Sequence, residues 1–169
     1  MAEAAGGSPD AFGELVRRHQ NGLLNFFRRM GASTDAEDLV QETFLRVFKY
    51  RTRYKPRARF STFLYVLARH AWADRGRRAA RTARLQVGLK AETDVQHDGA
   101  PPSTAGGLDV EEALNRLSPK LREAVVLNIC QGLRYQEVAD VLNIPLGTVK
   151  SRINLALRDL RRVMNEDGR

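Results

Sequence analysis

The chain has 169 residues, with 28 Lys and Arg against 20 Asp and Glu, and a formal net charge of +8. This length accommodates one ordinary domain or two small ones, and the positive charge favours a polyanionic partner, either a nucleic acid or a membrane surface. No apolar run approaches the roughly 20 residues that span a bilayer, and the N-terminus lacks the pattern of a signal peptide. We therefore expect a cytoplasmic protein.

The cysteine and histidine residues argue against a disulfide and against a metal site. Cys130 is the only cysteine, so no internal disulfide can form. It ends an apolar segment, where we expect a buried and inert thiol. His19, His70 and His97 are scattered without the spacing of zinc ligands. With no catalytic triad or phosphate-binding loop either, we expect no cofactor and no enzymatic activity.

Apolar periodicity predicts two helices at the start of the chain. The first extends from Pro9 to a stop at Gly31, and the second begins at Thr34, with Glu37 at the spacing of a capping box. Beside the apolar stripes of the second helix lies a mostly polar set: Asp38, Gln41, Glu42, Leu45 and Arg46. A partner-binding surface and an ordinary solvated face explain this set equally well.

Cations and aromatic rings alternate after the second helix. Residues 51–84 contain eleven Lys or Arg and a single acid, Asp74, and Tyr50, Tyr54 and Phe60 are interleaved with the first of these cations. Single-stranded nucleic acids bind such surfaces, because bases stack on the rings while the cations contact the phosphates. A solvated basic loop is the alternative interpretation.

The composition then divides the chain into two parts. A third helix is predicted for Ser61–Leu85, and residues 86–108 have no strong period and end in a segment rich in Gly, Pro and Ser. We interpret 86–108 as a flexible linker between a domain at 1–85 and a domain at 109–169. Because no strand pattern occurs, the predicted class is all-α, with two small helical domains.

The second domain ends in a predicted helix-turn-helix, Leu133–Arg162. The segment Asn143-Ile144-Pro145 interrupts the helical pattern, and apolar residues recur at helical spacing after it. Short polar and cationic side chains occupy the other positions of the second helix, among them Lys150, Ser151, Arg152, Asn154 and Arg158. Such a helix can enter the major groove of DNA; a plain helical hairpin with a basic face is the alternative.

Three segments together resemble the extracytoplasmic-function group of the bacterial sigma-70 family. DAEDLVQETFLRVFK, at 35–49, resembles region 2.2, which binds the coiled coil of the RNA polymerase β′ clamp. RFSTFLYVLARHAWADRGRR, at 59–78, resembles regions 2.3 and 2.4, and residues 117–162 resemble region 4. Each segment alone is moderate support, but their order and the intervening linker make the resemblance specific.

The resemblance implies roles for individual residues. It places six residues against the polymerase clamp: Asp38, Leu39, Gln41, Glu42, Leu45 and Arg46. It assigns the −10 element of the promoter to Tyr54, Phe60, Phe63, Tyr65, His70, Trp72, Arg75, Arg77 and Arg78, although Phe63 and Tyr65 also fit a role in the core. It assigns the −35 element to Thr148, Lys150, Ser151, Arg152, Asn154 and Arg158.

The expected function is that of a promoter-specificity subunit. It would bind the β′ clamp and β flap of core RNA polymerase, read the −35 element as duplex and the −10 element as unpaired non-template strand, and be held inactive by an anti-sigma factor, in many members membrane-bound. One rival is a stand-alone helix-turn-helix repressor or activator, which leaves residues 51–84 unexplained. Another is an RNA-binding enzyme or its accessory subunit, which the lack of a reactive constellation disfavours.

Overall fold

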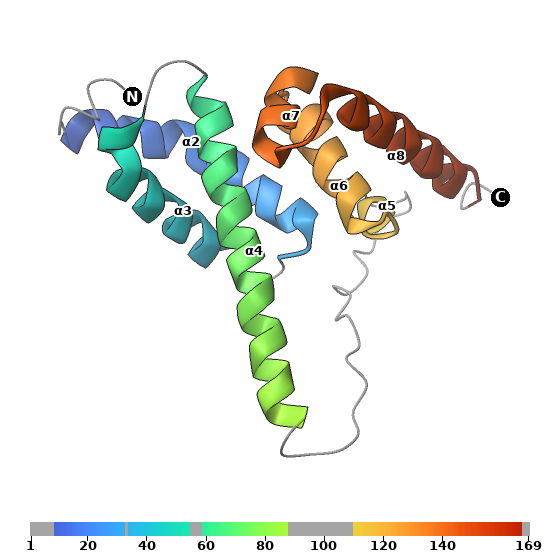
Figure 1. Ribbon diagram of the computed structural model, residues 1–169, viewed down its shortest axis with the longest axis horizontal. Coiled ribbons are helices and arrows are strands. Elements are labelled where there is room, and N and C mark those ends of the chain that lie inside the picture. Colours follow the sequence, from blue (N-terminus) through green and yellow to red (C-terminus); the bar gives the residue numbers. More distant parts are fainter. Residues whose placement is uncertain (1–8, 33, 55–58, 88–109, 167–169) are drawn as a thin grey trace.

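The computed structural model describes residues 9–32, 34–54, 59–87 and 110–166, and all regular elements within these ranges are helical (Figure 1). The all-α prediction is therefore confirmed. The linker beyond residue 87 and residues 55–58 of the basic segment lie outside the described residues. The N-terminal half consists of α2 (Pro9–Met30), α3 (Ala36–Tyr50), the short 3₁₀-helix η1 (Arg51–Arg53) and α4 (Phe60–Val87).

The three N-terminal α-helices pack around a small apolar core. Phe26 and Phe27 of α2 meet Val47 of α3 and Leu64 of α4, and all four side chains are fully buried. The C-terminal half of α4 projects beyond the other helices (Figure 1), and residues 76–82 are all exposed. This half is rich in Ala and Arg, which are strong helix formers, so it does not require an apolar partner along its length.

The start of α3 differs from the sequence prediction. A helix beginning at Thr34 with a capping box is expected, but α3 begins at Ala36 with Asp35 as the N-cap and without a side-chain capping hydrogen bond. The Asp35 carboxylate instead accepts a hydrogen bond from Nε of Arg75 in α4. A tertiary ion pair has replaced the local cap.

The C-terminal half contains the predicted helix-turn-helix. Its elements are α5 (Val110–Asn115), α6 (Pro119–Val125), the π-helix η2 (Val126–Cys130), α7 (Tyr135–Leu142) and α8 (Leu146–Glu166). Asn143 adopts φ = 52° between α7 and α8, in the left-handed region that Asn tolerates. Val149, Ile153 and Ala156 of α8 are fully buried, as their helical spacing predicts.

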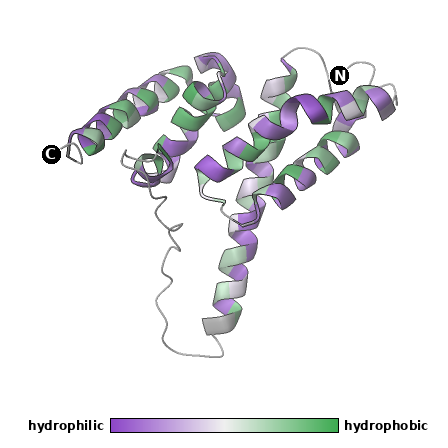
Figure 2. Cartoon of the chain, turned by 180° about the vertical axis from the view of Figure 1, so that it is seen from behind, coloured by the Kyte–Doolittle hydropathy of each residue, from purple (hydrophilic) through white to green (hydrophobic). Residues whose placement is uncertain are grey.

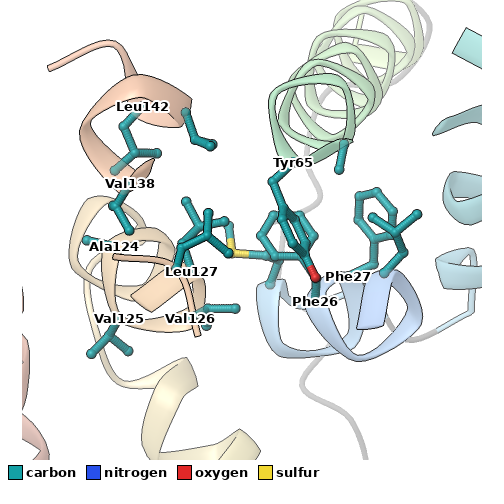
Figure 3. Packing of buried hydrophobic residues seen from close by; sticks show 14 of the residues in the cluster. Phe26, Phe27, Tyr65, Ala124, Val125, Val126, Leu127, Val138 and Leu142 are labelled. Carbon is teal, nitrogen blue, oxygen red and sulfur yellow. The ribbon is translucent and has the colours of Figure 1, made fainter. Parts of the chain in front are cut away.

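The two halves share one continuous hydrophobic core. Val126 and Leu127 of η2 lie opposite Phe26 and Tyr65 of the N-terminal half (Figure 3). Seen from behind, polar and apolar residues alternate along the projecting part of α4 (Figure 2). The sequence leaves the relative arrangement of the two parts open; the structure packs α2 and α4 directly against η2 and α7.

Candidate polymerase-binding and nucleic-acid interfaces

The outer face of α3 presents a mixed polar and apolar surface. Asp38 and Gln41 are exposed, Leu45 is 70% exposed and Phe48 is 48% exposed. A large exposed apolar side chain beside charged groups is typical of a protein-binding surface. The sequence analysis did not single out Phe48 for this surface, although its position one turn after Leu45 would have revealed it.

Two residues assigned to the same surface lie elsewhere. Leu39 is only 4% exposed and belongs to the core, because it occupies the inner stripe of α3. The side chain of Arg46 is 21% exposed and points its guanidinium toward α4. Neither residue is presented to an external partner in the way that Asp38 and Leu45 are.

Five charged side chains join α3 to α4, and we call them the α3–α4 ion network: Glu42, Arg46, Asp74, Arg77 and Arg78. Nη2 of Arg46 donates to Oε1 of Glu42 at 2.5 Å and to Oδ2 of Asp74 at 2.7 Å. Nη2 of Arg78 donates to both Glu42 oxygens, at 2.9 and 3.1 Å, and Arg77 donates to Oδ1 of Asp74.

The pKa shifts in this network follow from these hydrogen bonds. The hydrogen bond from Arg46, followed by that from Arg77, lowers the pKa of Asp74 below its usual value. Burial by itself would lower the pKa of Arg46, but its hydrogen bonds to Asp74 and Glu42 outweigh burial and raise it. These hydrogen bonds therefore favour the charged forms of both Arg46 on α3 and Asp74 on α4.

Aromatic rings gather where α4 begins. The ring centroids of Tyr54 and Phe63 are 5.2 Å apart, and Phe60 lies 6.3 Å from each of them. His19 of α2 packs against Phe60 at 5.1 Å with its ring nearly perpendicular. The sequence predicted Tyr54 and Phe60 as base-stacking residues, and the family resemblance implied Phe63 as a candidate for the −10 element. Neither gave a sign that His19 joins them.

The helix α4 carries the remaining candidates for the −10 element. His70 is exposed, and Trp72 is half-buried with the Arg75 guanidinium 4.8 Å from its ring centroid. The side chains of Arg77 and Arg78 are 71% and 66% exposed, although both are engaged in the α3–α4 ion network. At about 100° per residue, these side chains are distributed around α4 and do not share one face of the helix.

Tyr65 lies in the interface between the two halves. It is 6% exposed, and its hydroxyl donates to Oε1 of Gln131 at 2.6 Å. Burial raises the pKa of Tyr65 well above its ordinary value. A Cβ on Gly22 would lie 3.2 Å from the Tyr65 hydroxyl, so α2 approaches closely here. In this arrangement Tyr65 serves the core and the interface, while a direct contact with DNA is closed to it.

Further polar contacts cross the same interface. Nε of Arg69 donates to Glu123 at 3.0 Å, and Arg59 lies 3.6 Å from Glu137. Arg122 of α6 donates to the Met30 carbonyl at 3.4 Å. These partners come from segments far apart in the sequence, so no local pattern could have paired them.

The helix-turn-helix presents the residues assigned to the −35 element. Lys150, Ser151, Asn154 and Arg158 are exposed on α8, while Thr148 and Arg152 are half-buried. The fully buried Val149 and Ile153 alternate with them and fix which face of α8 is outward. The second helix of the motif can therefore offer side chains to base edges and phosphates together.

Other kinds of site find no support in the described ranges. No helix there is long and apolar enough to cross a membrane, and no group of three metal-binding side chains occurs there. Cys130 is half-buried beside Arg29, and burial raises the pKa of its thiol. A raised pKa keeps the thiol protonated and weakly reactive.

Two family models match the chain in succession. The model described as Sigma-70 region 2 matches residues 15–82, and that described as Sigma-70, region 4 matches residues 107–160. The first match contains the aromatic cluster and the α3–α4 ion network. The second contains the helix-turn-helix.

Several curated proteins are similar along most of the chain. The ECF RNA polymerase sigma factor SigE of Mycolicibacterium smegmatis is 35% identical over 88% of this chain, which spans 59% of SigE. The RNA polymerase sigma factor CarQ of Myxococcus xanthus is 33% identical over 95% of this chain and 92% of CarQ. SigW of Bacillus subtilis, also an ECF sigma factor, is 28% identical over 95% of this chain and 92% of SigW.

Solved structures share the fold. CnrH, solved in complex with the cytosolic domain of CnrY, is 29% identical, with a TM-score of 0.73 over 98% of this chain and 95% of CnrH. The sigma factor RpoE of Bartonella quintana, solved with the anti-sigma factor NepR, has a TM-score of 0.76 at 24% identity over 92% of this chain and 97% of RpoE. The chain therefore belongs to the sigma-70 family, and within that family to the extracytoplasmic-function group.

Proposed function

We propose that this chain binds core RNA polymerase and directs it to promoters that have two separate elements. The observation that carries the proposal is the exposure of Lys150, Ser151, Asn154 and Arg158 on the second helix of a helix-turn-helix, in a chain that also matches sigma region 2. One half would read duplex DNA and the other would bind polymerase and unpaired DNA. The chain acts as a binding subunit and carries out no covalent step of its own.

The polymerase contact is assigned to the outer face of α3. Asp38 and Gln41 supply polar groups for the β′ clamp and Leu45 supplies an apolar side chain that a partner can cover, whereas Glu42 is held by Arg46 and Arg78. An exposed Leu surrounded by polar groups fits the usual anatomy of an interface, with an apolar centre and a polar rim. The domain of residues 1–85 therefore carries this contact.

The −10 element is assigned to the aromatic cluster and to side chains of α4. Tyr54, Phe60 and Phe63 offer rings on which a base of the non-template strand can stack, at about 1–3 kcal/mol per base. His70 and Trp72 are further candidates on different sides of α4, and Arg75, Arg77 and Arg78 supply cations for the phosphates. Capture of an unpaired base offsets the few kcal/mol needed to unstack it.

The −35 element is assigned to α8 in the domain of residues 109–169. Lys150, Ser151, Arg152 and Asn154 approach base edges in the major groove, whereas Thr148 and Arg158 contact phosphates. The same domain would bind the β flap of the polymerase. The two domains would each reach one element of the same promoter.

A protein inhibitor is the second proposed partner. The similar structure of CnrH was solved with the cytosolic domain of CnrY bound, which supports a regulatory partner for this chain that also has a cytosolic domain. Such an anti-sigma factor would cover Leu45 and Phe48, which are large, apolar and exposed on α3. Substituting either residue would then weaken both the inhibitor complex and the polymerase complex.

The test is run-off transcription with purified core polymerase on promoters taken from upstream of the protein's own gene. Wild type is compared with Asp38→Ala/Gln41→Ala and with Tyr54→Ala, and Arg17→Ala in an exposed pair on α2 is the control. We expect transcription that depends on the added chain, is lost in the double variant and is altered in promoter preference by Tyr54→Ala.

Binding assays separate this function from its rivals. A sigma factor binds core polymerase and recognises promoter duplex well only in the holoenzyme, whereas a stand-alone repressor binds its operator unaided. A chain that fails to bind core polymerase in a fluorescence titration contradicts the proposal. Tight binding of duplex DNA by the isolated chain would favour the repressor.

A further inference from the structure

Arg46 lies on the helix assigned to polymerase, yet its guanidinium faces the helix assigned to DNA. Its side chain is 21% exposed, and a single nitrogen, Nη2, bridges Glu42 on its own helix and Asp74 on α4. A residue that contacts an external protein would instead direct its charge outward. The position of Arg46 therefore requires a different explanation from that of Asp38 or Gln41.

Both carboxylates that Arg46 holds are shared with arginines of α4. Glu42 also accepts from Arg78, and Asp74 also accepts from Arg77. The side chains of Arg77 and Arg78 are 71% and 66% exposed, so their outer N–H groups remain available to a phosphate. Each carboxylate that Arg46 binds is therefore also bound by a candidate DNA-binding cation, Arg77 or Arg78.

We propose that Arg46 is a positioning residue for the −10 element and not a contact of core polymerase. Through Asp74 and Glu42 it fixes the directions of Arg77 and Arg78 and the angle at which the projecting half of α4 leaves α3. The proposal rests on the function proposed above. In this proposal Arg46, a residue of α3, affects promoter melting only through its contacts with α4.

The chemistry of arginine suits this role better than that of lysine. The planar guanidinium presents five donors in a fixed geometry and can hold two carboxylates at once, whereas an ammonium group is a point charge on a flexible stem. The network also contains two acids and three arginines, so loss of Arg46 leaves Glu42 and Asp74 paired but not joined to each other. One link between α3 and α4 is then lost, while the pair of Glu42 with Arg78 still joins the two helices.

The experiment measures two properties of each variant separately. Core affinity is measured by titrating fluorescently labelled chain with core polymerase. Melting is measured on preassembled holoenzyme, by the fluorescence of a base analogue in the −10 element of a promoter that wild-type holoenzyme has selected from a random library. The variants are Arg46→Ala, Arg46→Lys, Asp74→Ala and the double variant Arg46→Ala/Asp74→Ala.

The control is Arg17→Ala, which removes an arginine from an exposed pair with Glu14 on α2. It changes the net charge by the same amount as Arg46→Ala, far from the proposed site. Asp74→Ala changes a half-exposed residue and provides a readout that does not depend on how well Arg46→Ala folds. Circular dichroism confirms that each variant is helical before it is used.

We expect Arg46→Ala to bind core polymerase within about twofold of wild type and to melt the promoter about three- to tenfold more slowly, as loss of a part-buried charged hydrogen bond implies. Asp74→Ala should slow melting similarly, and the double variant should add little, because both remove the same link. Arg46→Lys should recover part of the rate.

Two results would overturn the proposal. One is a loss of core affinity in Arg46→Ala together with a wild-type melting rate in the holoenzyme that does form. The other is additive losses in the double variant, since independent contacts add. If wild-type chain itself neither binds core polymerase nor melts any promoter, the proposed function fails as well, and this outcome is visible before any variant is compared.

Discussion

The two candidate DNA-binding helices carry their cations in opposite electrostatic settings. On α4, Arg75 is paired with Asp35, Arg77 with Asp74, and Arg78 with Glu42. On α8, Lys150 and Arg152 have no ion pair with any residue in the ranges that the structure describes, and Arg158 lies 4.0 Å from its exposed neighbour Asp159. Lys150 and Arg158 of α8 are exposed to solvent, while Arg75, Arg77 and Arg78 of α4 already have acidic partners.

This difference has a consequence for DNA binding. A phosphate that reaches α8 releases condensed counterions from the DNA and displaces water from the side chains. A phosphate that reaches Arg77 or Arg78 must in addition compete with a carboxylate held near 3 Å. We infer that α8 contributes more of the sequence-independent attraction to DNA, and that α4 depends more on its aromatic cluster. Four predictions test the comparison.

The largest effect is expected from breaking the core that both helices share. Ile153→Ala in α8 and Leu64→Ala in α4 each remove a fully buried side chain, and each should lower the free energy of unfolding by about 2–5 kcal/mol. Because one hydrophobic cluster includes both residues, calorimetry should show a single transition that either variant shifts. Two transitions, of which each variant moves only one, would mean that the halves unfold independently.

The next effect concerns the cations themselves. Arg152→Ala, at a base-reading position, should cost about 1–3 kcal/mol of promoter binding and relax specificity at one base pair. Arg158→Ala should reduce the slope of log affinity against log salt by about 1, as loss of a phosphate contact does. Arg77→Ala should change that slope by less, because Arg77 has Asp74 as its partner. Promoter binding by the holoenzyme of each variant is measured between about 50 and 200 mM salt, a range over which such slopes are resolved. Equal slopes for Arg77→Ala and Arg158→Ala would contradict the proposed difference between α4 and α8.

A smaller effect is expected at the interface between the N-terminal and C-terminal halves. Tyr65→Phe removes the hydrogen bond to Gln131 and should lower the free energy of unfolding by about 0.5–1.5 kcal/mol. The matched control is Tyr135→Phe, which changes a tyrosine that is 38% exposed on α7. Urea titration of both variants provides the comparison. A Tyr65→Phe protein as stable as the control would show that this contact contributes nothing to holding the halves together.

The smallest effect is a pH dependence confined to the N-terminal half. Burial, reinforced by the charge of Arg18, lowers the pKa of His19 below its usual 6.5. The folded state then favours neutral His19, so its contribution to stability is complete above pH 6.5 and decreases as the pH falls through the lowered pKa. Tm measured between pH 7.5 and 5 should fall for wild type and fall less for His19→Gln. His70→Gln, at an exposed position, is the control, and an unchanged slope in His19→Gln would refute the assignment.

Local sequence was sufficient for most of the fold. The helical periodicity of Val149, Ile153 and Ala156 predicted which face of α8 is buried, and Pro145 marked the break before it. The start of α3 was predicted less well, because Asp35 pairs with Arg75 from another helix and the local capping signal does not operate. Propensity and capping act within a few residues, whereas such an ion pair depends on which helices become neighbours.

The candidate site shows the same division. Exposure of Asp38, Gln41 and Leu45 followed from the apolar stripes of α3, because a helix that buries one face must present the other. The burial of Tyr65 did not follow, since its position on α4 would suit a DNA contact if the C-terminal half were absent. Tyr65 is buried where the C-terminal half packs on the N-terminal half, with η2 against α2, α7 against α4, and Gln131 bound to the Tyr65 hydroxyl.

The amino-acid sequence by itself therefore determined the helices, the outward face of the helix-turn-helix, the aromatic and cationic composition of the −10 surface, and membership of the sigma-70 family. The tertiary structure alone decided that the two halves form one core, that Tyr65 is buried within it, and that Arg46 turns toward Asp74. The physical reason is the separation along the chain of the residues that interact. Periodicity and helix propensity are properties of neighbouring residues along the chain, while ion pairs and packing between helices arise only when distant segments meet.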